Sequence, residues 1–261
     1  MILRRMGNKS KISSEIQKYF PDHSIYIEPF FGAGGMFFNK QKVRHNIVND
    51  LDSDVFNLFQ VVSTRKKDLE DAFYAMPVHS DLLEYWKNNK ETDEIRRALR
   101  LILLSNYTFN GAGASIVFGA SSSSAGYKID FYNKLNACNE KLFNVQFMNC
   151  DFRKFFASIM LDDRKGDGET GKSFIYADPP YINTGDNYSN SFSEKDSIDL
   201  FDCLQETGCK WAMSEFNNDF IIKQAEERKL NIIEIGERQN LKNRRIEILV
   251  TNYAKPKTLF D

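Results

Sequence analysis

The order of apolar and polar segments along the chain restricts its fold more than any other feature of the sequence. Seven short apolar segments have the length and composition of buried β-strands, and amphipathic helical patterns follow several of them. These segments are residues 24–30, 45–50, 145–152, 173–178, 210–216, 230–236 and 245–253. Strands that alternate with helices predict an α/β fold, in which helices cover both faces of a mostly parallel sheet. The last two strands are expected to form an antiparallel edge.

Residues 62–144 interrupt this alternation between the second and third predicted strands. Charged helical patterns come first, and a glycine- and serine-rich segment at 109–128 then has the pattern of a β-hairpin. A further helical pattern follows at 129–143. We therefore expect a mostly helical domain over 62–144, inserted into a sheet domain formed by residues 1–61 and 145–261.

Composition and charge exclude several classes of protein. No apolar stretch approaches the roughly 20 residues that span a bilayer, and the amino-terminal residues lack an apolar segment of secretory length. The 4 scattered cysteines show no paired metal spacing and indicate reduced thiols in a cytoplasmic protein, and the 3 histidines do not favour a metal site. Because the net charge is −1, binding to nucleic acid would need local basic patches.

Residues 174–181, FIYADPPY, end a predicted central strand in a rigid polar corner. Pro179 and Pro180 fix their own φ angles and lack an N–H, and Pro179 also keeps Asp178 extended. The corner presents a carboxylate, backbone carbonyls and the ring of Tyr181 at the carboxyl end of a strand, where open α/β sheets bind ligands. Taken alone, the same residues could form a loop whose aspartate caps the next helix.

Two other predicted strand ends carry residues that suit a nucleoside. Gly32 and Gly34 follow the first strand and allow the backbone to approach a ligand closely. Asp50 ends the second strand, where an acid can accept hydrogen bonds from ribose hydroxyls or cap the following helix. Asp52 is also available for the cap, which would leave Asp50 for the ligand.

The third predicted strand ends in Asp151 and Phe152, which could accept from an adenine amino group and lie against its ring. Three strand ends of this kind in one sheet predict a nucleoside site. The chain lacks the G-x-x-x-x-G-K-[ST] phosphate loop, so a nucleoside triphosphate is disfavoured. S-adenosylmethionine fits better, because its cationic sulfonium favours acids and carbonyls and it carries no phosphate.

Five motifs, in this order, resemble those of the Dam-like adenine-specific DNA methyltransferases. They are RRMGNKSKI, EPFFGAGGMFF, NDLD, NCDF and DPPY. In this group of amino-methyltransferases the cofactor motif precedes the recognition insertion and Asp-Pro-Pro-Tyr follows it, and the resemblance covers nearly the whole chain. It implies a Rossmann-like methyltransferase sheet that binds S-adenosylmethionine, formed by 1–61 and 145–261, with a DNA target-recognition domain at 62–144.

The resemblance also implies the residues that bind the cofactor. They are Arg5, Gly7, Asn8, Lys9, Glu28, Pro29, Phe30, Phe31, Gly32, Gly34, Asp50, Leu51, Asp151, Phe152 and Asp178. Two of them depart from the family pattern. Arg5 stands where the family has an aromatic residue, and Glu28 replaces the usual aspartate with one extra methylene.

By the same resemblance, catalysis falls to Asp178, Pro179, Pro180 and Tyr181. An adenine amino group is a poor nucleophile because its lone pair is delocalised into the ring. The Asp178 carboxylate and the Pro179 carbonyl could accept its two hydrogens and favour a pyramidal nitrogen, while Tyr181 stacks on the base. Because the amine cannot be reached inside a duplex, the target base would be flipped out.

The implied partner is double-stranded DNA, bound at a short motif. The candidate DNA-binding residues are Arg96, Arg97, Arg100, Asn106, Tyr107, Asn110, Lys128, Arg244 and Arg245. A restriction endonuclease that acts on the same site is a further expected partner if the enzyme belongs to a restriction–modification system; the alternative is an orphan or phage methylase. We expect a monomer, because the enzyme would act on one strand at a time.

Three alternatives remain from the sequence. Cytosine methylation on the exocyclic amine can use almost the same catalytic corner, and RNA adenine is a more distant possibility. A non-catalytic subunit that binds DNA or cofactor would be expected to lose the corner or the glycines, and both are intact. Protein glutamine methylation is disfavoured, because related enzymes carry Asn where this chain has Asp178.

Overall fold

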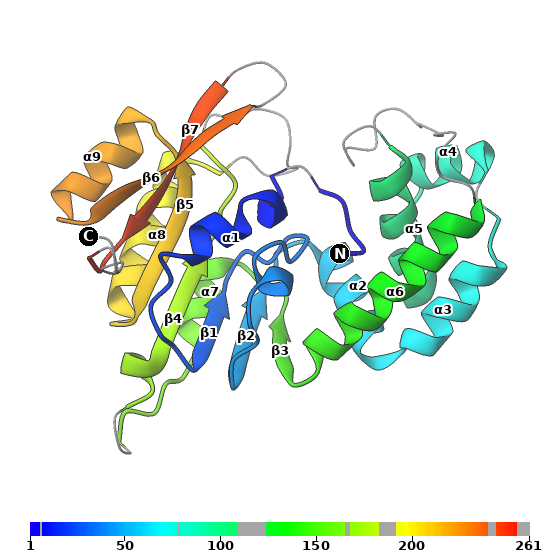
Figure 1. Cartoon of the computed structure of the whole chain (residues 1–261), viewed down its shortest axis with the longest axis horizontal. Helices are drawn as coiled ribbons and strands as arrows, with labels where there is room; N and C mark the ends of the chain where they lie inside the picture. Colours follow the sequence, from blue (N-terminus) through cyan, green and yellow to red (C-terminus); the bar gives the residue numbers. More distant parts are fainter. Residues whose placement is uncertain are drawn as a thin grey trace.

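Seven strands form one sheet at the centre of the computed structural model (Figure 1). The structure describes residues 1–5, 7–77, 79–108, 124–164, 168–182, 192–239 and 244–254, without the side chains of 124–129, 238, 239 and 244. The strands are β1 (Ile25–Glu28), β2 (His45–Asn49), β3 (Val145–Met148), β4 (Ser173–Ala177), β5 (Lys210–Phe216), β6 (Asn231–Gln239) and β7 (Arg244–Thr251). Their order is β3-β2-β1-β4-β5-β7-β6. All seven predicted strands are therefore present in a single sheet.

The first five strands are parallel, and β7 is antiparallel to both of its neighbours, β5 and β6. This confirms the predicted parallel sheet with an antiparallel edge. Strands β1 and β4 are buried at every position, as expected where helices cover both faces of a parallel sheet. Because β1 lies between β2 and β4, the chain changes direction across the sheet there, which places a ligand crevice at the carboxyl ends of these strands.

Each face of the sheet has its own apolar core, since successive side chains of a strand point to opposite faces. Tyr26 of β1 packs on the side of α1 (Ser13–Gln17) and α2 (Ser53–Thr64). Ile25 and Ile27 pack on the other side, against α7 (Phe152–Ser158), α8 (Glu194–Glu206) and α9 (Asp219–Glu227). The predicted three-layer arrangement is thus observed.

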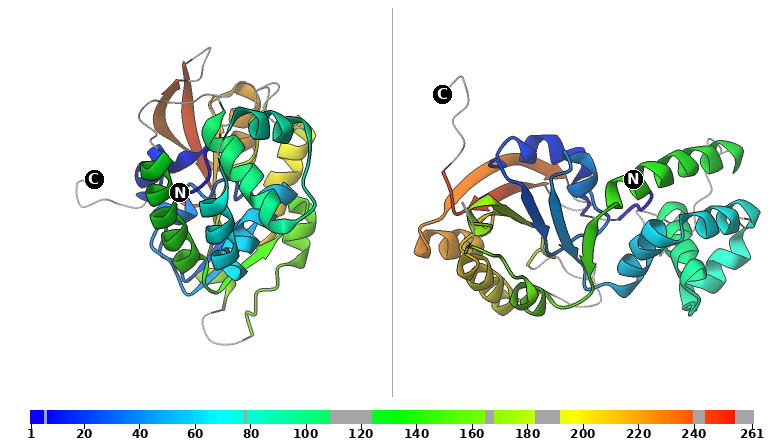
Figure 2. Two further views of the ribbon diagram at one scale, coloured as in Figure 1. Left: turned by 90° about the vertical axis from the view of Figure 1, so that its right-hand side faces the viewer. Right: turned by 90° about the horizontal axis from the view of Figure 1, so that it is seen from below.

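A group of helices lies beyond β3, on one side of the sheet (Figures 1 and 2). It contains α3 (Lys66–Ala75), α4 (Ser80–Asn88), α5 (Glu94–Tyr107) and α6 (Ser124–Leu142). The helical patterns read from the sequence are present, whereas α4 was not predicted. The expected boundary between residues 61 and 62 falls inside α2, which packs against α5 and α6, and the division into two domains stays a prediction. Residues 109–123 of the expected hairpin lie outside the described residues, and residues 124–128 are helical instead, as the first part of α6.

Three short 3₁₀ turns complete the described elements: η1 (Lys9–Lys11), η2 (Phe37–Asn39) and η4 (Thr170–Lys172). The residues that follow the glycine turn form η2. Within the described ranges, every helix is too short or too polar to cross a bilayer. The same residues hold no cluster of three or more potential metal ligands.

Candidate active site

A cavity of about 590 Å³ opens at the carboxyl ends of the parallel strands, a size typical of a site for a small molecule. Its walls come from the loops after β1, β2, β3 and β4 and from the amino-terminal segment. Every residue predicted to bind the cofactor or to take part in catalysis lines this cavity except Gly34. The predicted residues therefore meet in one place, although they come from five separate segments.

The glycine turn after β1 brings backbone N–H groups to the cavity. Gly32 has a φ of +54°, and its N–H donates to Asp50 Oδ2 at 2.6 Å. Gly34, at a φ of +71°, lies behind the wall, where a Cβ would collide with the rings of Phe31 and Phe38. Its role is to turn the chain. Gly35 lines the cavity instead. It was not predicted, because the spacing of Gly32 and Gly34 already matched the motif.

Asp50 and Asp52 take different positions: Asp52 caps a helix, and Asp50 faces the cavity. Asp52 caps α2 by accepting from Asp54 N at 3.0 Å, and it also pairs with Arg5 at 2.9 Å. Asp50 faces the cavity and accepts from Asp52 N at 2.8 Å as well as from Gly32. Burial raises the pKa of Asp50, and the Arg5 guanidinium and these N–H groups oppose that shift.

Three phenylalanine rings form the apolar side of the cavity. Phe30 lies 5.6 Å from Phe152 and 6.1 Å from Phe192, measured between ring centroids. The guanidinium of Arg153 lies 4.3 Å from the Phe152 centroid, while Asp151 caps α7 by accepting from Arg153 N at 2.9 Å. Such a group of rings can hold a planar aromatic ligand. Phe192 was not among the residues predicted to bind the cofactor, because an isolated phenylalanine before a helix carries no signal of this contact.

The Asp-Pro-Pro-Tyr corner is held by groups from distant parts of the chain. Lys9, whose side chain is only 2% exposed, lies 2.7 Å from Asp178 Oδ1 and also contacts the Tyr181 hydroxyl. Tyr181 donates to Glu247 Oε1 at 2.6 Å and packs edge-on against Phe216 at 4.4 Å. Burial, together with the charges of Asp178 and Glu247, raises the pKa of Tyr181 well above its usual value, so its hydroxyl keeps its proton.

Glu28, one of the two residues that depart from the family pattern, is buried at the end of β1 and lines the cavity. It accepts from the Tyr26 hydroxyl at 2.8 Å. Burial raises the pKa of Glu28 well above its usual range, and the Tyr26 hydrogen bond only partly opposes this. On the far side of Tyr26, Lys40 lies 4.2 Å from the ring centroid, and burial lowers the pKa of Lys40 to about 8.

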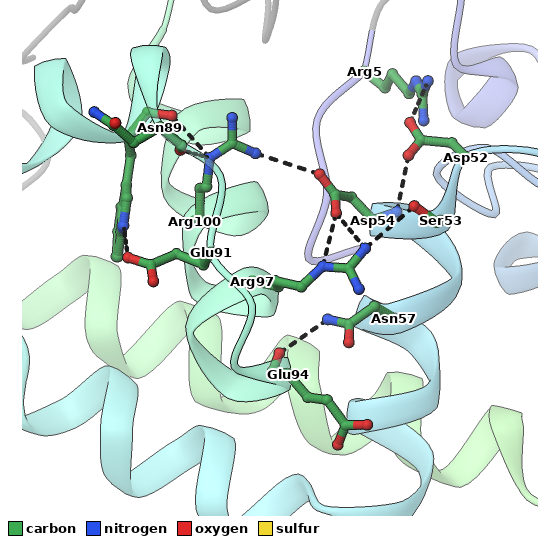
Figure 3. Close-up of polar contacts among 11 residues, drawn as sticks. Arg5, Asp52, Ser53, Asp54, Asn57, Asn89, Glu91, Glu94, Arg97 and Arg100 are labelled. Carbon is green, nitrogen blue, oxygen red and sulfur yellow. Dashed lines mark hydrogen bonds and ion pairs between the residues drawn. The ribbon is translucent and has the colours of Figure 1, made fainter.

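Two of the arginines expected to contact DNA, Arg97 and Arg100, have partners within the chain (Figure 3). Arg97 donates to Asp54 Oδ1 through two nitrogens, at 3.0 and 2.6 Å. Arg100 lies 3.3 Å from Asp54 Oδ2 and also donates to the carbonyls of Trp86 and Asn89. Arg97 therefore ties α5 to the start of α2, and Arg100 ties α5 to both α2 and the end of α4.

Arg96 differs, because its side chain is 59% exposed and pairs with Glu91, at 3.0 Å. Asn106 donates to the carbonyls of Ile2 and Ile102, and Tyr107 is 8% exposed.

Of the four remaining residues expected to bind DNA, only Arg245 has a described side chain. The guanidinium of Arg245 lies 5.5 Å from the Phe216 centroid. Asn110 lies outside the described residues, as do the side chains of Lys128 and Arg244. The DNA contacts proposed from the sequence remain predictions.

The sheet order and the residues gathered at its carboxyl edge define a Rossmann-like methyltransferase fold. The profile of the D12 class N6 adenine-specific DNA methyltransferase family matches residues 6–241. The chain therefore belongs to the D12 class of adenine-specific DNA methyltransferases, which confirms the resemblance read from its motifs.

Curated relatives carry related names. A DNA adenine methylase of Haemophilus influenzae is 30% identical over 196 residues, which cover 69% of this chain and 63% of the relative. One from Vibrio cholerae is 25% identical over 228 residues, covering 78% and 76%. The type II methyltransferase M1.LlaDCHI of Lactococcus lactis subsp. cremoris is 24% identical over 284 residues, covering 95% and 93%.

Among solved structures, the rRNA methyltransferase aviRa from Streptomyces viridochromogenes matches with a TM-score of 0.39 and 9% identity, over 93% of this chain and 84% of that one. This likeness is too distant to bear on fold or function.

Proposed function

We propose that this protein transfers the methyl group of S-adenosylmethionine to the exocyclic 6-amino group of an adenine that is flipped out of a short duplex DNA motif. Membership of the D12 class favours adenine in DNA over the cytosine and RNA alternatives. The observation that carries the proposal is that Asp50 and the Asp178 corner line the same cavity. A nucleoside site and an amine-binding corner that share one cavity suit transfer between a nucleoside cofactor and a base.

The residues of the cavity fit S-adenosylmethionine. Asp50 is placed to receive ribose hydroxyls at the end of β2, and Phe30, Phe152 and Phe192 are placed to hold an adenine ring. Carboxylates and backbone carbonyls at the ends of β1 and β4 suit a sulfonium cation. When bound, the cofactor supplies an electrophilic methyl group.

The chain's own residues would orient the target amine. Lys9 fixes Asp178 through its Oδ1 atom, and the carboxylate can then accept one amino hydrogen while the Pro179 carbonyl accepts the other. The positive charge that develops on the nitrogen lies next to a carboxylate, which stabilises the transition state. Tyr181 presents its ring to the base, because its hydroxyl is held by Glu247.

The name of one relative indicates a biological role for the methylation. M1.LlaDCHI is named a type II methyltransferase. We infer from this name that the present enzyme modifies the site of a partner endonuclease, and action without such a partner is the alternative.

Transfer of labelled methyl from S-adenosylmethionine to unmethylated genomic DNA tests the proposal, followed by nucleoside analysis and single-molecule mapping of the modified site. N6-methyladenine at one short motif is expected. Methylcytosine would overturn the choice of base, and transfer to RNA alone would overturn the choice of substrate.

Asp178→Ala should abolish transfer and leave most of the cofactor affinity in place. Full activity in that variant would contradict the assigned mechanism.

A further inference from the structure

Glu247 is a buried acid that lies next to the catalytic corner but outside the cavity lining. It belongs to β7, the antiparallel strand between β5 and β6 (Figure 1). In the register of β5 and β7, Glu247 is the partner of Phe216, so both side chains point to the same face of the sheet. These two residues also touch Tyr181 from two sides.

One oxygen atom of Glu247 holds two groups of the corner. Oε1 accepts the Tyr181 hydroxyl at 2.6 Å and lies 3.1 Å from Lys9 Nζ. The same ammonium reaches Asp178 Oδ1 at 2.7 Å. Glu247 is therefore linked to the catalytic carboxylate through Lys9 and to the base-stacking ring through its hydroxyl.

The charges of this cluster suit the reaction. A fully buried ammonium needs a carboxylate partner, and Asp178 alone would supply one. With Glu247, the cluster holds one ammonium and two carboxylates, so its formal charge is negative beside a site where a cationic methyl donor and a developing positive amine would meet. A neutral residue at 247 would remove that excess and release the ammonium from one side.

We propose that Glu247 is a positioning residue for methyl transfer, which acts through Lys9 and Tyr181 to fix the Asp178 carboxylate and the aromatic ring against the target base. This assignment rests on the proposed function. It differs from a purely structural role because the contacts of Glu247 run to the catalytic corner, whereas the neighbouring buried acid Glu215 accepts backbone N–H groups of Ile182 and Phe216.

A double-mutant cycle of Glu247→Gln and Tyr181→Phe tests the assignment. Each protein is assayed for single-turnover transfer to DNA, for cofactor affinity by calorimetry and for melting temperature. Glu247→Gln keeps the size of the side chain, and we expect transfer to slow by about 10- to 100-fold, because small misplacements of reacting groups cost that much. The cofactor affinity should change by less than about threefold, since Glu247 does not line the cavity.

The cycle separates positioning from support of the fold. Because both substitutions break the same link, the double variant should be little slower than Glu247→Gln alone. Effects that multiply, a wild-type rate in Glu247→Gln, or a loss of rate explained by the unfolded fraction would overturn the assignment.

If Glu247→Gln does not fold, Tyr181→Phe alone decides. Slower transfer at an unchanged melting temperature supports the link, and a wild-type rate overturns it. The wild-type assay reports on the proposed function separately: no transfer to DNA by the wild type overturns that function, and the role of Glu247 with it, whereas wild-type transfer combined with an active Glu247→Gln overturns the role of Glu247 alone.

Discussion

The buried ammonium of Lys9 pairs with the half-buried carboxylate of Asp178, with 2.7 Å between Nζ and Oδ1, although Lys9 lies in the first 3₁₀ turn and Asp178 follows the fourth strand. The amino-terminal segment thus meets the Asp-Pro-Pro-Tyr corner. Under the proposed function, Lys9 would hold the Asp178 carboxylate in addition to making the cofactor contact that the family resemblance implies.

The first prediction concerns this pair. Lys9→Met should reduce the transfer rate by at least about 100-fold, because Asp178 and Glu247 would lose the ammonium between them and the carboxylate would shift. Lys11→Met is the matched control, since Lys11 is exposed in the same turn. Single-turnover kinetics of both variants, with melting temperatures, would decide the point. Equal rates in the two variants would show that the ion pair is dispensable.

The second prediction separates Asp50 from Asp52. Asp50→Ala should weaken cofactor binding by about 10- to 100-fold, the cost of losing hydrogen bonds from a ligand to a charged acceptor. Asp52→Ala should mainly lower the free energy of unfolding, by about 1 kcal/mol, because Asp52 caps α2. Titration calorimetry and urea unfolding of both variants test this division. Unchanged affinity in Asp50→Ala would remove the ribose role.

The sequence predicted the sheet and most of the cavity because those signals are local. A short apolar segment that stops at Asp50 or at Asp178 marks both a strand and the edge where ligands bind. The helix α4 escaped prediction because it buries only Leu83 and Trp86, too few positions for a clear helical period. Glu247 escaped because a single acid in the segment RIEILV reads as one position of an alternating strand.

The arginines of α5 show what a sequence cannot distinguish. A charged helix face looks the same whether its partner is a phosphate or a carboxylate elsewhere in the chain. Arg97 and Arg100 face Asp54, which precedes them by some 40 residues, and only the packing of α5 on α2 brings them together (Figure 3).

The third prediction follows from these contacts. Arg97→Ala should lower the free energy of unfolding by roughly 1–2 kcal/mol, because it breaks a two-nitrogen contact with Asp54 in a partly buried setting. Arg96→Ala should leave stability within about 0.5 kcal/mol and reduce the salt dependence of DNA binding by about one charge, because Arg96 is exposed. Urea unfolding and fluorescence anisotropy at several salt concentrations measure the two effects. The reverse pattern would make Arg97 the phosphate contact.

The fourth prediction concerns pH and the second buried acid of the antiparallel edge. Burial raises the pKa of Glu215 to about 8, although its hydrogen bonds from Ile182 and Phe216 oppose the shift. Between the usual glutamate value of about 4.3 and this raised value, the folded protein binds a proton that the unfolded chain has released. Through Glu215 the free energy of unfolding should therefore be highest below this window and fall as pH rises through it, by up to about 1.4 kcal/mol per pH unit.

Glu215→Gln, which imitates the protonated side chain, should flatten this fall, whereas Glu206→Gln at an exposed position of α8 should leave it intact. Urea unfolding at intervals from pH 5 to pH 8 measures the slope for the wild type and both variants. An equal slope in the wild type and Glu215→Gln would mean that Glu215 is ionised throughout, held as a carboxylate by its two N–H donors and by Lys9.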